Sequence, residues 1–222
     1  MSNERWSPVE VKVWGPLACF TRPEMKVERV SYPVMTPSAA RGLLEMIHWK
    51  PEFQWRIDEI WVLKEIRWFS VRRNEVKSLA SDRVAREWAQ RGGGYLASED
   101  RAQRHTLGLS DVAYVIRAHP IPNNGSTADT AKHRDQFRRR VARGQCFAMP
   151  YLGCRELAAS FSPIDDDDRP IERTEELGRM LLDLTYPKSG RGQATPHFFD
   201  ARLEGGVLRV PPMPGGEETQ PC

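Results

Sequence analysis

The sequence has few cysteines and no long apolar run. Its four cysteines, at positions 19, 146, 154 and 222, form no Cys-x-x-Cys pair and show none of the spacings of zinc ligands. Mean hydropathy is −0.58, and no stretch is long and apolar enough for a membrane-spanning helix. The first residues, MSNERWSPVEV, lack the apolar segment of a secretory signal. We therefore expect a reduced, cytoplasmic protein without membrane contact and without structural metal.

The motifs of several common enzyme classes are also missing. There is no P-loop, no G-x-S-x-G and no H-E-x-x-H. The run Asp165–Asp168 contains four consecutive carboxylates, but consecutive side chains cannot all face one ion, so a solvated loop is the simpler interpretation. The sequence therefore predicts no metal site and no cofactor.

Charge is distributed unevenly along the 222 residues. Residues 165–222 contain 7 Lys and Arg against 12 Asp and Glu, whereas residues 1–164 contain 26 against 18. All seven tryptophans lie in residues 1–164 as well. A basic region with aromatic residues is the footprint expected for a polyanionic partner. We expect residues 1–164 to form one domain that binds this partner, and residues 165–222 to form an extension with a flexible acidic tail.

The hydrophobic pattern of residues 1–164 predicts a β-α-β-β-α-β order. Val9–Trp14 alternates apolar and polar residues, as a strand does. Thr36 is a good N-cap and Pro37 a good first residue for a helix over 37–48. The other predicted elements are a strand over 57–69, a strand over 111–121, a helix over 130–143 closed by Gly144, and an extended stretch over 146–162. This order is that of the ferredoxin-like (RRM-like) fold, in the α+β class.

Two regions lie outside this order. Residues 71–104 contain a possible strand continuation, a short amphipathic helix in DRVAREWAQ and a glycine-rich break over 91–95, and their role stays open. Beyond residue 164, the runs 177–186, 197–204 and 206–212 read as strands, with Gly205-Gly206 as a hairpin signal. This pattern predicts a small C-terminal antiparallel β-sheet and a disordered tail over 215–222.

The end of the first helix carries candidate functional residues. His48 lies in its last turn and is followed by Trp49, Lys50 and the helix-ending Pro51. An ionisable ring, an indole that can stack on a base and a cation together suit an RNA phosphate and its nucleotide.

The second helix opens with Lys132 and His133, in a turn whose free backbone N–H groups attract an anion. His133 shares a face with Phe137 and Val141, at four-residue spacing, so we expect it to point inward. The cations of this helix are Lys132, Arg134, Arg138, Arg139, Arg140 and Arg143. Two interpretations remain open: a solvated basic helix, or a helix that binds RNA phosphates.

A ribonuclease that works without metal needs few groups. A base takes the proton of a ribose 2′-OH, an acid protonates the departing 5′-oxygen, and a cation stabilises the phosphoryl charge. His48, His133 and Lys132 could fill these roles if the fold brings the two helices together. His105, His119 and His197 are weaker candidates, for which surface, RNA-contact and structural roles are all compatible with the sequence.

Several motifs resemble one known family. They are the run FTRPEMKVERVSYPVMTPSAARGLLEMIHWKP, RRNEV at 72–76, Lys132-His133 with FRRRVARGQ, and LGCREL at 152–157. Together they resemble the subtype-d branch of the fifth Cas protein family, the crRNA-processing subunit of type I-C CRISPR systems, from about residue 8 to 210. The resemblance implies a ferredoxin-like N-terminal domain with a small antiparallel β extension. It also implies metal-independent cleavage of the repeat hairpin of precursor CRISPR RNA, which leaves a 2′,3′-cyclic phosphate.

The resemblance further implies a catalytic set and a set of partners. The family has a Tyr at the end of the first helix and a Lys-His pair at the start of the second. Lys132 and His133 match the pair, and His48 stands in place of the Tyr. The expected RNA-binding residues are Trp49, Lys50, Arg134, Arg138, Arg139 and Arg140.

The expected partners are precursor CRISPR RNA, the crRNA 5′ handle and other subunits of the Cascade surveillance complex, with DNA as a further candidate. The isolated chain is expected to be monomeric. Two alternatives stay open, a non-catalytic crRNA-binding scaffold of the same complex and a general nucleic-acid-binding protein.

Overall fold

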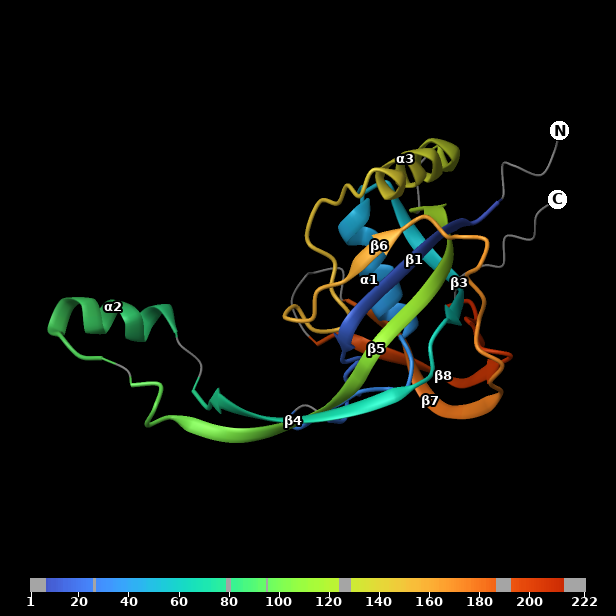
Figure 1. Ribbon diagram of the computed structural model, residues 1–222. Helices are drawn as coiled ribbons and strands as arrows, with labels where there is room; N and C mark the ends of the chain where they lie inside the picture. Colours follow the sequence, from blue (N-terminus) through green and yellow to red (C-terminus); the bar gives the residue numbers. More distant parts are fainter. Residues whose placement is uncertain are drawn as a thin grey trace.

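The computed structural model describes residues 7–25, 27–78, 81–94, 96–123, 129–186 and 193–213. The strands are β1 (Val9–Ala18), β2 (Arg29–Val30), β3 (Phe53–Val62), β4 (Arg67–Val76), β5 (Arg101–Pro122), β6 (Ser160–Ser162), β7 (Glu175–Thr185), β8 (Thr195–Glu204) and β9 (Val207–Arg209). The helices are α1 (Pro37–Ile47), α2 (Asp82–Arg91) and α3 (Thr130–Ala142). They form a mixed α/β fold dominated by one curled sheet, in which all strand pairs except β2 with β5 are antiparallel (Figure 1).

The long strand β5 is the centre of the sheet. The strand order is β6-β1-β5-β3-β9-β8-β7, and β2 and β4 also pair with β5. The predicted strands over 9–14 and 111–121 are confirmed, and both are longer than expected. The extended stretch expected over 146–162 is wrong for most of its length, because only Ser160–Ser162 is a strand. The preceding segment instead follows the end of α1 and then Cys19, whose N–H donates to the carbonyl of Leu152.

Helix α1 forms where its sequence predicts it. The hydroxyl of Thr36 accepts a hydrogen bond from the backbone N–H of Ala39 at 3.3 Å, and Pro37 opens the helix. The buried face of the helix consists of Pro37, Ala40, Leu43, Leu44 and Ile47. This face packs against β3 and β7 of the sheet, in the same apolar core as Val9, Val11 and Val13 of β1. The helix ends at Ile47, with His48 as its C-cap.

The single strand expected over 57–69 is wrong, because the chain forms two separate strands there. β3 ends at Val62 and β4 begins at Arg67, and both pair with β5. At the break Lys64 bonds to Asp111 of β5, at 2.6 Å, and Asp111 has a positive φ of 52°. β5 therefore changes direction where its partner strand changes, and the run 57–69, which is rich in β-branched and aromatic residues, contains no signal for this tertiary bend.

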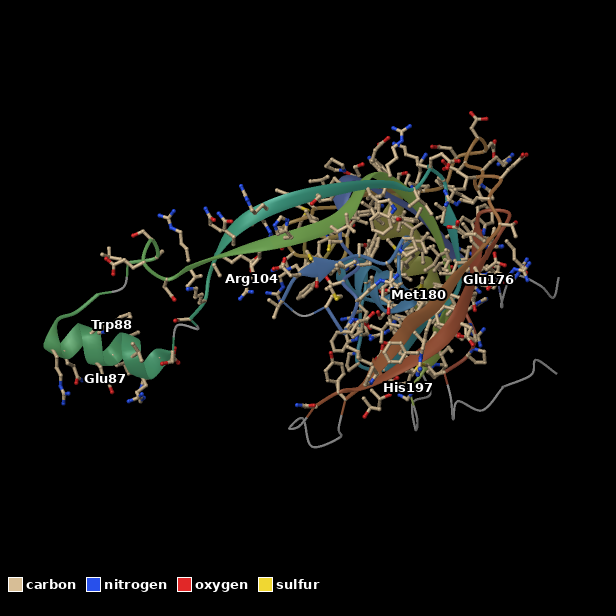
Figure 2. The ribbon with its side chains drawn as sticks, turned by 90° about the horizontal axis from the view of Figure 1, so that it is seen from below. Glu87, Trp88, Arg104, Glu176, Met180 and His197 are labelled. Carbon is tan, nitrogen blue, oxygen red and sulfur yellow. The ribbon has the colours of Figure 1, made fainter. Side chains whose placement is uncertain are left out.

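The β4–β5 hairpin forms an arm that leaves the body of the molecule, with α2 at its end (Figures 1 and 2). The expected amphipathic helix is thereby confirmed, with the hydroxyl of Ser81 as N-cap acceptor for Val84 at 3.3 Å. No residue of α2 is buried, so this helix adds nothing to the core.

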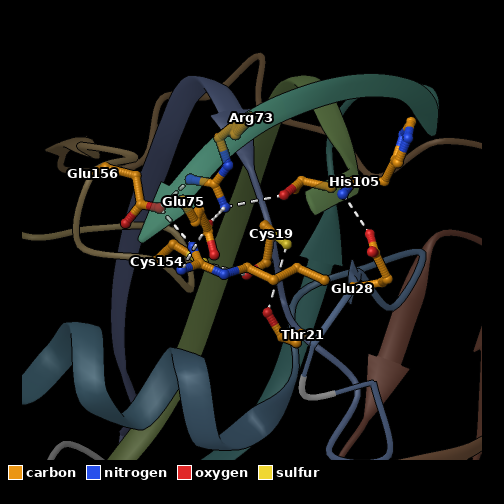
Figure 3. Close-up of polar contacts among 10 residues, drawn as sticks. Cys19, Thr21, Glu28, Arg73, Glu75, His105, Cys154 and Glu156 are labelled. Atoms are coloured by element: carbon orange, nitrogen blue, oxygen red, sulfur yellow. Dashed lines mark hydrogen bonds and ion pairs between the residues drawn. The ribbon is translucent and has the colours of Figure 1, made fainter. Parts of the chain in front are cut away.

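A charged cluster fixes the arm to the body at its base (Figure 3). Arg73 of β4 bonds to Glu156 at 2.9 Å and to Glu75 at 3.0 Å. Arg29 of β2 bonds to the same Glu156 carboxylate at 2.6 Å. Arg29 also lies 3.7 Å from the thiol of Cys154. The cluster ties three separate segments together where the arm begins.

The C-terminal strands extend the same sheet. β9 pairs with β3, and β7 and β8 follow at that edge. The predicted hairpin turn is confirmed, since Gly205 and Gly206 have φ values of 54° and 76°, a region that glycine enters without steric cost. The side chain of Arg41 of α1 donates twice to Asp183 of β7, at 2.7 Å each. The expected disordered tail, 215–222, lies outside the described residues.

Among the described residues, no helix is long and apolar enough to cross a membrane. The described cysteines, Cys19, Cys146 and Cys154, are free thiols.

Candidate functional site

The ends of α1 and α3 bring two histidines into contact. Nε2 of His48 lies 3.3 Å from Nδ1 of His133, and the rings stack with their centroids 5.6 Å apart. The sequence left open whether the fold brings the two helices together, and in the structure they meet at these two residues. His133 also points inward beside Phe137 and Val141, as expected. Both histidines are buried, with exposed fractions of 0% for His48 and 3% for His133.

Two aromatic residues of β3 support the pair. The ring of Phe53 stacks on His133 with centroids 4.5 Å apart and lies 5.6 Å from the ring of His48. The indole N–H of Trp55 donates to the backbone carbonyl of His48 at 2.9 Å. Because alternate residues of β3 face inward, the strand places both aromatic side chains on the site.

The chain after α3 fixes the end of α1. The guanidinium of Arg140 donates to the carbonyl of Ile47 at 2.7 Å. The backbone N–H groups of Phe147 and Ala148 donate to the carbonyl of Met46 at 2.8 and 3.2 Å. The last carbonyls of a helix have no partner within it, so these three donors hold the turn that carries His48.

The sequence analysis missed one residue of the site. Glu52, which directly precedes β3, lies with Oε1 3.0 Å from Nε2 of His133. Its carboxylate is 48% exposed, so a chain of contacts runs from the surface through His133 to His48. A single Glu after a proline belongs to no motif, and the contact with His133 depends on the folded chain.

Burial lowers the pKa of His48 to about 4, with further contributions from the charges of Arg140, His133 and Lys50. His48 is therefore neutral near pH 7. Its Nδ1 is buried and has no hydrogen-bond partner among the described residues. This nitrogen is therefore not used by a hydrogen bond within the described part of the fold.

Lys132 lies apart from the histidine pair. It is exposed and lines an open hollow on the outer side of α3 together with Asp135, Arg138 and Arg139. Neighbouring helical residues point about 100° apart, so Lys132 and His133 lie on different sides of the same turn. In the described part of the chain, Lys132 and Arg139 have no ion pair.

The other expected RNA-binding residues differ in their surroundings. Trp49 is 53% exposed and Lys50 is exposed, next to the buried His48. Arg134 is buried and lies 3.9 Å from Asp135. The guanidinium of Arg138 donates to Ser7 and to the carbonyl of Pro8, at 3.1 and 3.0 Å. Arg138 and Arg140 thus stabilise the fold through hydrogen bonds, whereas Arg139 makes no such contact among the described residues.

The weaker histidine candidates lie elsewhere. His119 of β5 bonds to Asp58 through Nδ1 at 2.5 Å. His197 bonds to Thr185 at 2.9 Å within the β7–β8 pair. The side chain of His105 is on the exposed arm, and its backbone N–H donates to Glu28 (Figure 3).

The acidic run Asp165–Asp168 forms no metal centre. Asp168 instead lies 2.5 Å from Nζ of Lys12, and its carboxylate accepts the N–H of Asp165 at 2.8 Å. No group of three or more His, Cys, Asp or Glu residues in the described ranges is arranged to hold a metal ion.

Curated relatives cover nearly the whole chain. The chain is 47% identical over 218 residues to the CRISPR pre-crRNA endoribonuclease Cas5d of Mannheimia succiniciproducens, covering 92% of this chain and 95% of that protein. It is 43% identical over 218 residues to the CRISPR pre-crRNA endoribonuclease Cas5d of Thermus thermophilus, covering 91% of each.

The fold is also found among solved structures. A crystal structure of a CRISPR-associated protein superposes with a TM-score of 0.65 and 22% sequence identity, covering 92% of both chains. The Cas5d family model, described as CRISPR-associated protein (Cas_Cas5), matches residues 9–211. From this match and the two curated relatives, the chain belongs to the Cas5d family of CRISPR-associated proteins.

Proposed function

We propose that the chain is an endoribonuclease that cleaves the repeat hairpin of precursor CRISPR RNA. The observation that carries this proposal is the 3.3 Å contact between His48 and His133, in a helix turn that carries the exposed Lys132 on another side. Two imidazoles and a cation are the groups that such a cleavage requires. The names of the two curated relatives describe the same activity.

The proposed reaction is attack of a ribose 2′-oxygen on the adjacent phosphorus. The 2′-oxygen loses its proton and forms a bond to phosphorus, while the bond to the 5′-oxygen breaks and that oxygen gains a proton. The products carry a 2′,3′-cyclic phosphate and a 5′-hydroxyl, and no step requires a metal ion. His48 and His133 serve the proton transfers, and Lys132 stabilises the charge on the phosphoryl oxygens.

For this reaction, the RNA must reach the two buried histidines. Both rings are covered, so bound RNA must displace covering side chains before it can touch a ring nitrogen. The neutral state of His48 suits a proton acceptor, because an imidazole must be unprotonated to take the 2′ proton. Lys132 is exposed in the same first turn of α3, where a phosphate would meet the helix start.

The order of strands and helices supports different roles for the N-terminal and C-terminal parts of the chain. We assign residues 1–164 to a ferredoxin-like RNA-binding and catalytic domain, in which the antiparallel order β6-β1-β5-β3 and the helices α1 and α3 follow the β-α-β-β-α-β pattern. Residues 165–222 form the β extension. Trp49, Lys50 and the cations of α3 are the proposed RNA contacts.

We further propose that the protein stays on the crRNA 5′ handle as a subunit of a type I-C Cascade complex in the cytoplasm. The isolated chain is monomeric in this proposal, and DNA is a further partner of the assembled complex. The competing function is that of a crRNA-binding scaffold that does not cut. The burial of both histidines favours this second function as long as RNA leaves the rings covered.

Incubation of the purified chain with its repeat RNA separates the two functions. The endoribonuclease yields two fragments from the hairpin and none from an RNA of scrambled sequence. A scaffold binds the hairpin and leaves it intact. Equal binding of hairpin and scrambled RNA, without cleavage, identifies a general nucleic-acid-binding protein.

A further inference from the structure

Glu52 is the exposed end of a three-residue contact chain. Its Oε1 lies 3.0 Å from Nε2 of His133, and Nδ1 of His133 lies 3.3 Å from Nε2 of His48. The backbone at Glu52 is itself held, because its carbonyl accepts the N–H of Asn123 at 3.0 Å. The amide of Asn123 also donates to the carbonyl of Pro51 at 2.7 Å. The carboxylate is therefore presented from a fixed point of the chain.

These contacts determine which ring nitrogens carry hydrogen. A carboxylate only accepts hydrogen bonds, so the hydrogen of neutral His133 lies on Nε2. Nδ1 of His133 is then an acceptor, and the hydrogen of His48 must lie on Nε2 to reach it. Nδ1 of His48 is left without hydrogen, and it is the atom that has no partner among the described residues. One carboxylate thereby sets the tautomer of two rings.

Packing alone cannot select one tautomer of the His133 ring. The stacked ring of Phe53 restricts the tilt of His133, but both tautomers of imidazole have the same shape. Only a hydrogen-bond partner in the plane of the ring distinguishes Nδ1 from Nε2. In the described part of the chain, Glu52 is the side chain that makes such a contact with Nε2 of His133, at 3.0 Å.

We propose that Glu52 is a positioning residue, which fixes His133 in its Nε2–H tautomer and so leaves Nδ1 of His48 as the proton acceptor. This inference rests on the proposed cleavage activity. When Nδ1 of His48 takes the 2′ proton, the ring becomes an imidazolium, whose Nε2–H still donates to Nδ1 of His133. Glu52 itself does not touch RNA in this arrangement.

The test uses Glu52→Ala and Glu52→Gln in the full chain, with Glu65→Ala as control. Glu65 is also an exposed glutamate, and it lies 3.7 Å from Arg173 and contacts no histidine. Single-turnover cleavage of repeat RNA and the Kd for the same RNA are measured for each protein. Glu52→Ala should cut about 10–100-fold more slowly at unchanged Kd, the range seen when a carboxylate that orients a functional histidine is removed. Glu52→Gln should recover most of that loss, because its amide oxygen still accepts from Nε2–H.

Histidine side-chain ¹⁵N NMR without RNA provides a second readout that does not depend on cleavage. The His133 signals should show the Nε2–H tautomer in wild type and Glu52→Gln, and a tautomer mixture in Glu52→Ala. Wild-type cleavage by Glu52→Ala, or an unchanged tautomer, overturns the inference. So does a Glu52→Gln protein as slow as Glu52→Ala, because the carboxylate would then act by its charge or as a base. A wild-type protein that does not cut at all contradicts the proposed function, and the NMR result still decides whether Glu52 sets the tautomer.

Discussion

Removing either imidazole should slow cleavage without removing RNA binding. His133→Ala and His48→Phe lose a group that transfers protons, which typically contributes about 10²–10⁴-fold to the rate. His48→Tyr should retain cleavage if a proton donor or hydrogen-bonding group is all that the site needs at this position. Single-turnover rates and Kd values for repeat RNA measure the separation, and melting temperatures verify that each buried-site variant is folded. If His48→Phe cuts at the wild-type rate, His48 is a packing residue and the site must be rebuilt around Lys132 and His133.

The lowered pKa of His48 also predicts how stability depends on pH. The unfolded chain binds a proton at His48 below about pH 6.5, whereas the folded chain does so only below about pH 4. The free energy of unfolding should therefore fall as the pH drops through this window, by up to about 3 kcal/mol from this residue. Urea unfolding of wild type and His48→Phe at about pH 7 and about pH 4.5 measures the difference. An equal loss in both proteins contradicts a buried, neutral His48.

The sequence analysis identified His48 and His133 but not Glu52, and there is a physical reason for the difference. His48 and His133 mark helix ends, and capping residues and four-residue periodicity are local patterns that can be read directly. Glu52 meets His133 across 81 positions of chain, and no local pattern encodes that contact. The inward direction of His133 could be read from its spacing to Phe137 and Val141, but the burial of His48 could not, because it depends on Phe53 and on the segment that contacts the end of α1.

At the scale of elements, the arginines of α3 should separate into two kinds. Arg139 is exposed without an ion pair among the described residues, so Arg139→Gln should weaken RNA binding and lower the slope of log Kd against log salt by about one. Arg140 instead holds the carbonyl of Ile47, so Arg140→Gln should lower the free energy of unfolding by about 1–3 kcal/mol. Salt-dependent binding and urea unfolding of both variants provide the measurement. A salt slope unchanged by Arg139→Gln assigns this face of α3 to solvent or to a protein interface.

The helix at the end of the arm should be dispensable for folding. No residue of α2 is buried, and the strands on either side are already joined where the N–H of Lys77 donates to the carbonyl of Asp100 at 3.0 Å. Replacing residues 79–98 by a short glycine-containing turn should therefore change the Tm by less than about 2 °C, as expected for surface changes. A larger drop, measured by thermal unfolding, shows that α2 contributes to the stability of the body.

The arm contains one element that could be predicted from the sequence and begins at a strand break that could not. The helix DRVAREWAQ is visible from its periodicity and its Ser81 cap, and α1 and α3 were found in the same way. The split between β3 and β4 was not, because residues 57–69 are rich in β-branched and aromatic residues on both sides of the break, which is set by the shared partner strand β5. The extended stretch predicted over 146–162 is a strand only at Ser160–Ser162, because the backbone contacts of the preceding segment with α1 and Cys19 leave no periodic signature in the sequence.

At the scale of the whole molecule, both parts of the chain share one sheet and one core. β9 joins the C-terminal strands to β3, and Met180 and Leu203 are buried in the same apolar cluster as Leu43 of α1. The acidic extension therefore stabilises the basic part that carries the histidines. The basic and the acidic part of the sequence therefore belong to one folded structure, and the match to the Cas5d family model, over residues 9–211, includes both of them.

The most direct test of the proposed chemistry uses two repeat RNAs with the full chain in excess chelator. One RNA is natural, and the other carries a single 2′-deoxy sugar at the scissile position. The natural RNA should be cut at an undiminished rate, and mass spectrometry should find a 2′,3′-cyclic phosphate on the upstream fragment. The 2′-deoxy RNA should bind equally well and remain intact, because it lacks the attacking oxygen. Cleavage of the 2′-deoxy RNA, or activity that is lost in chelator and restored by Mg²⁺ or Mn²⁺, contradicts the account.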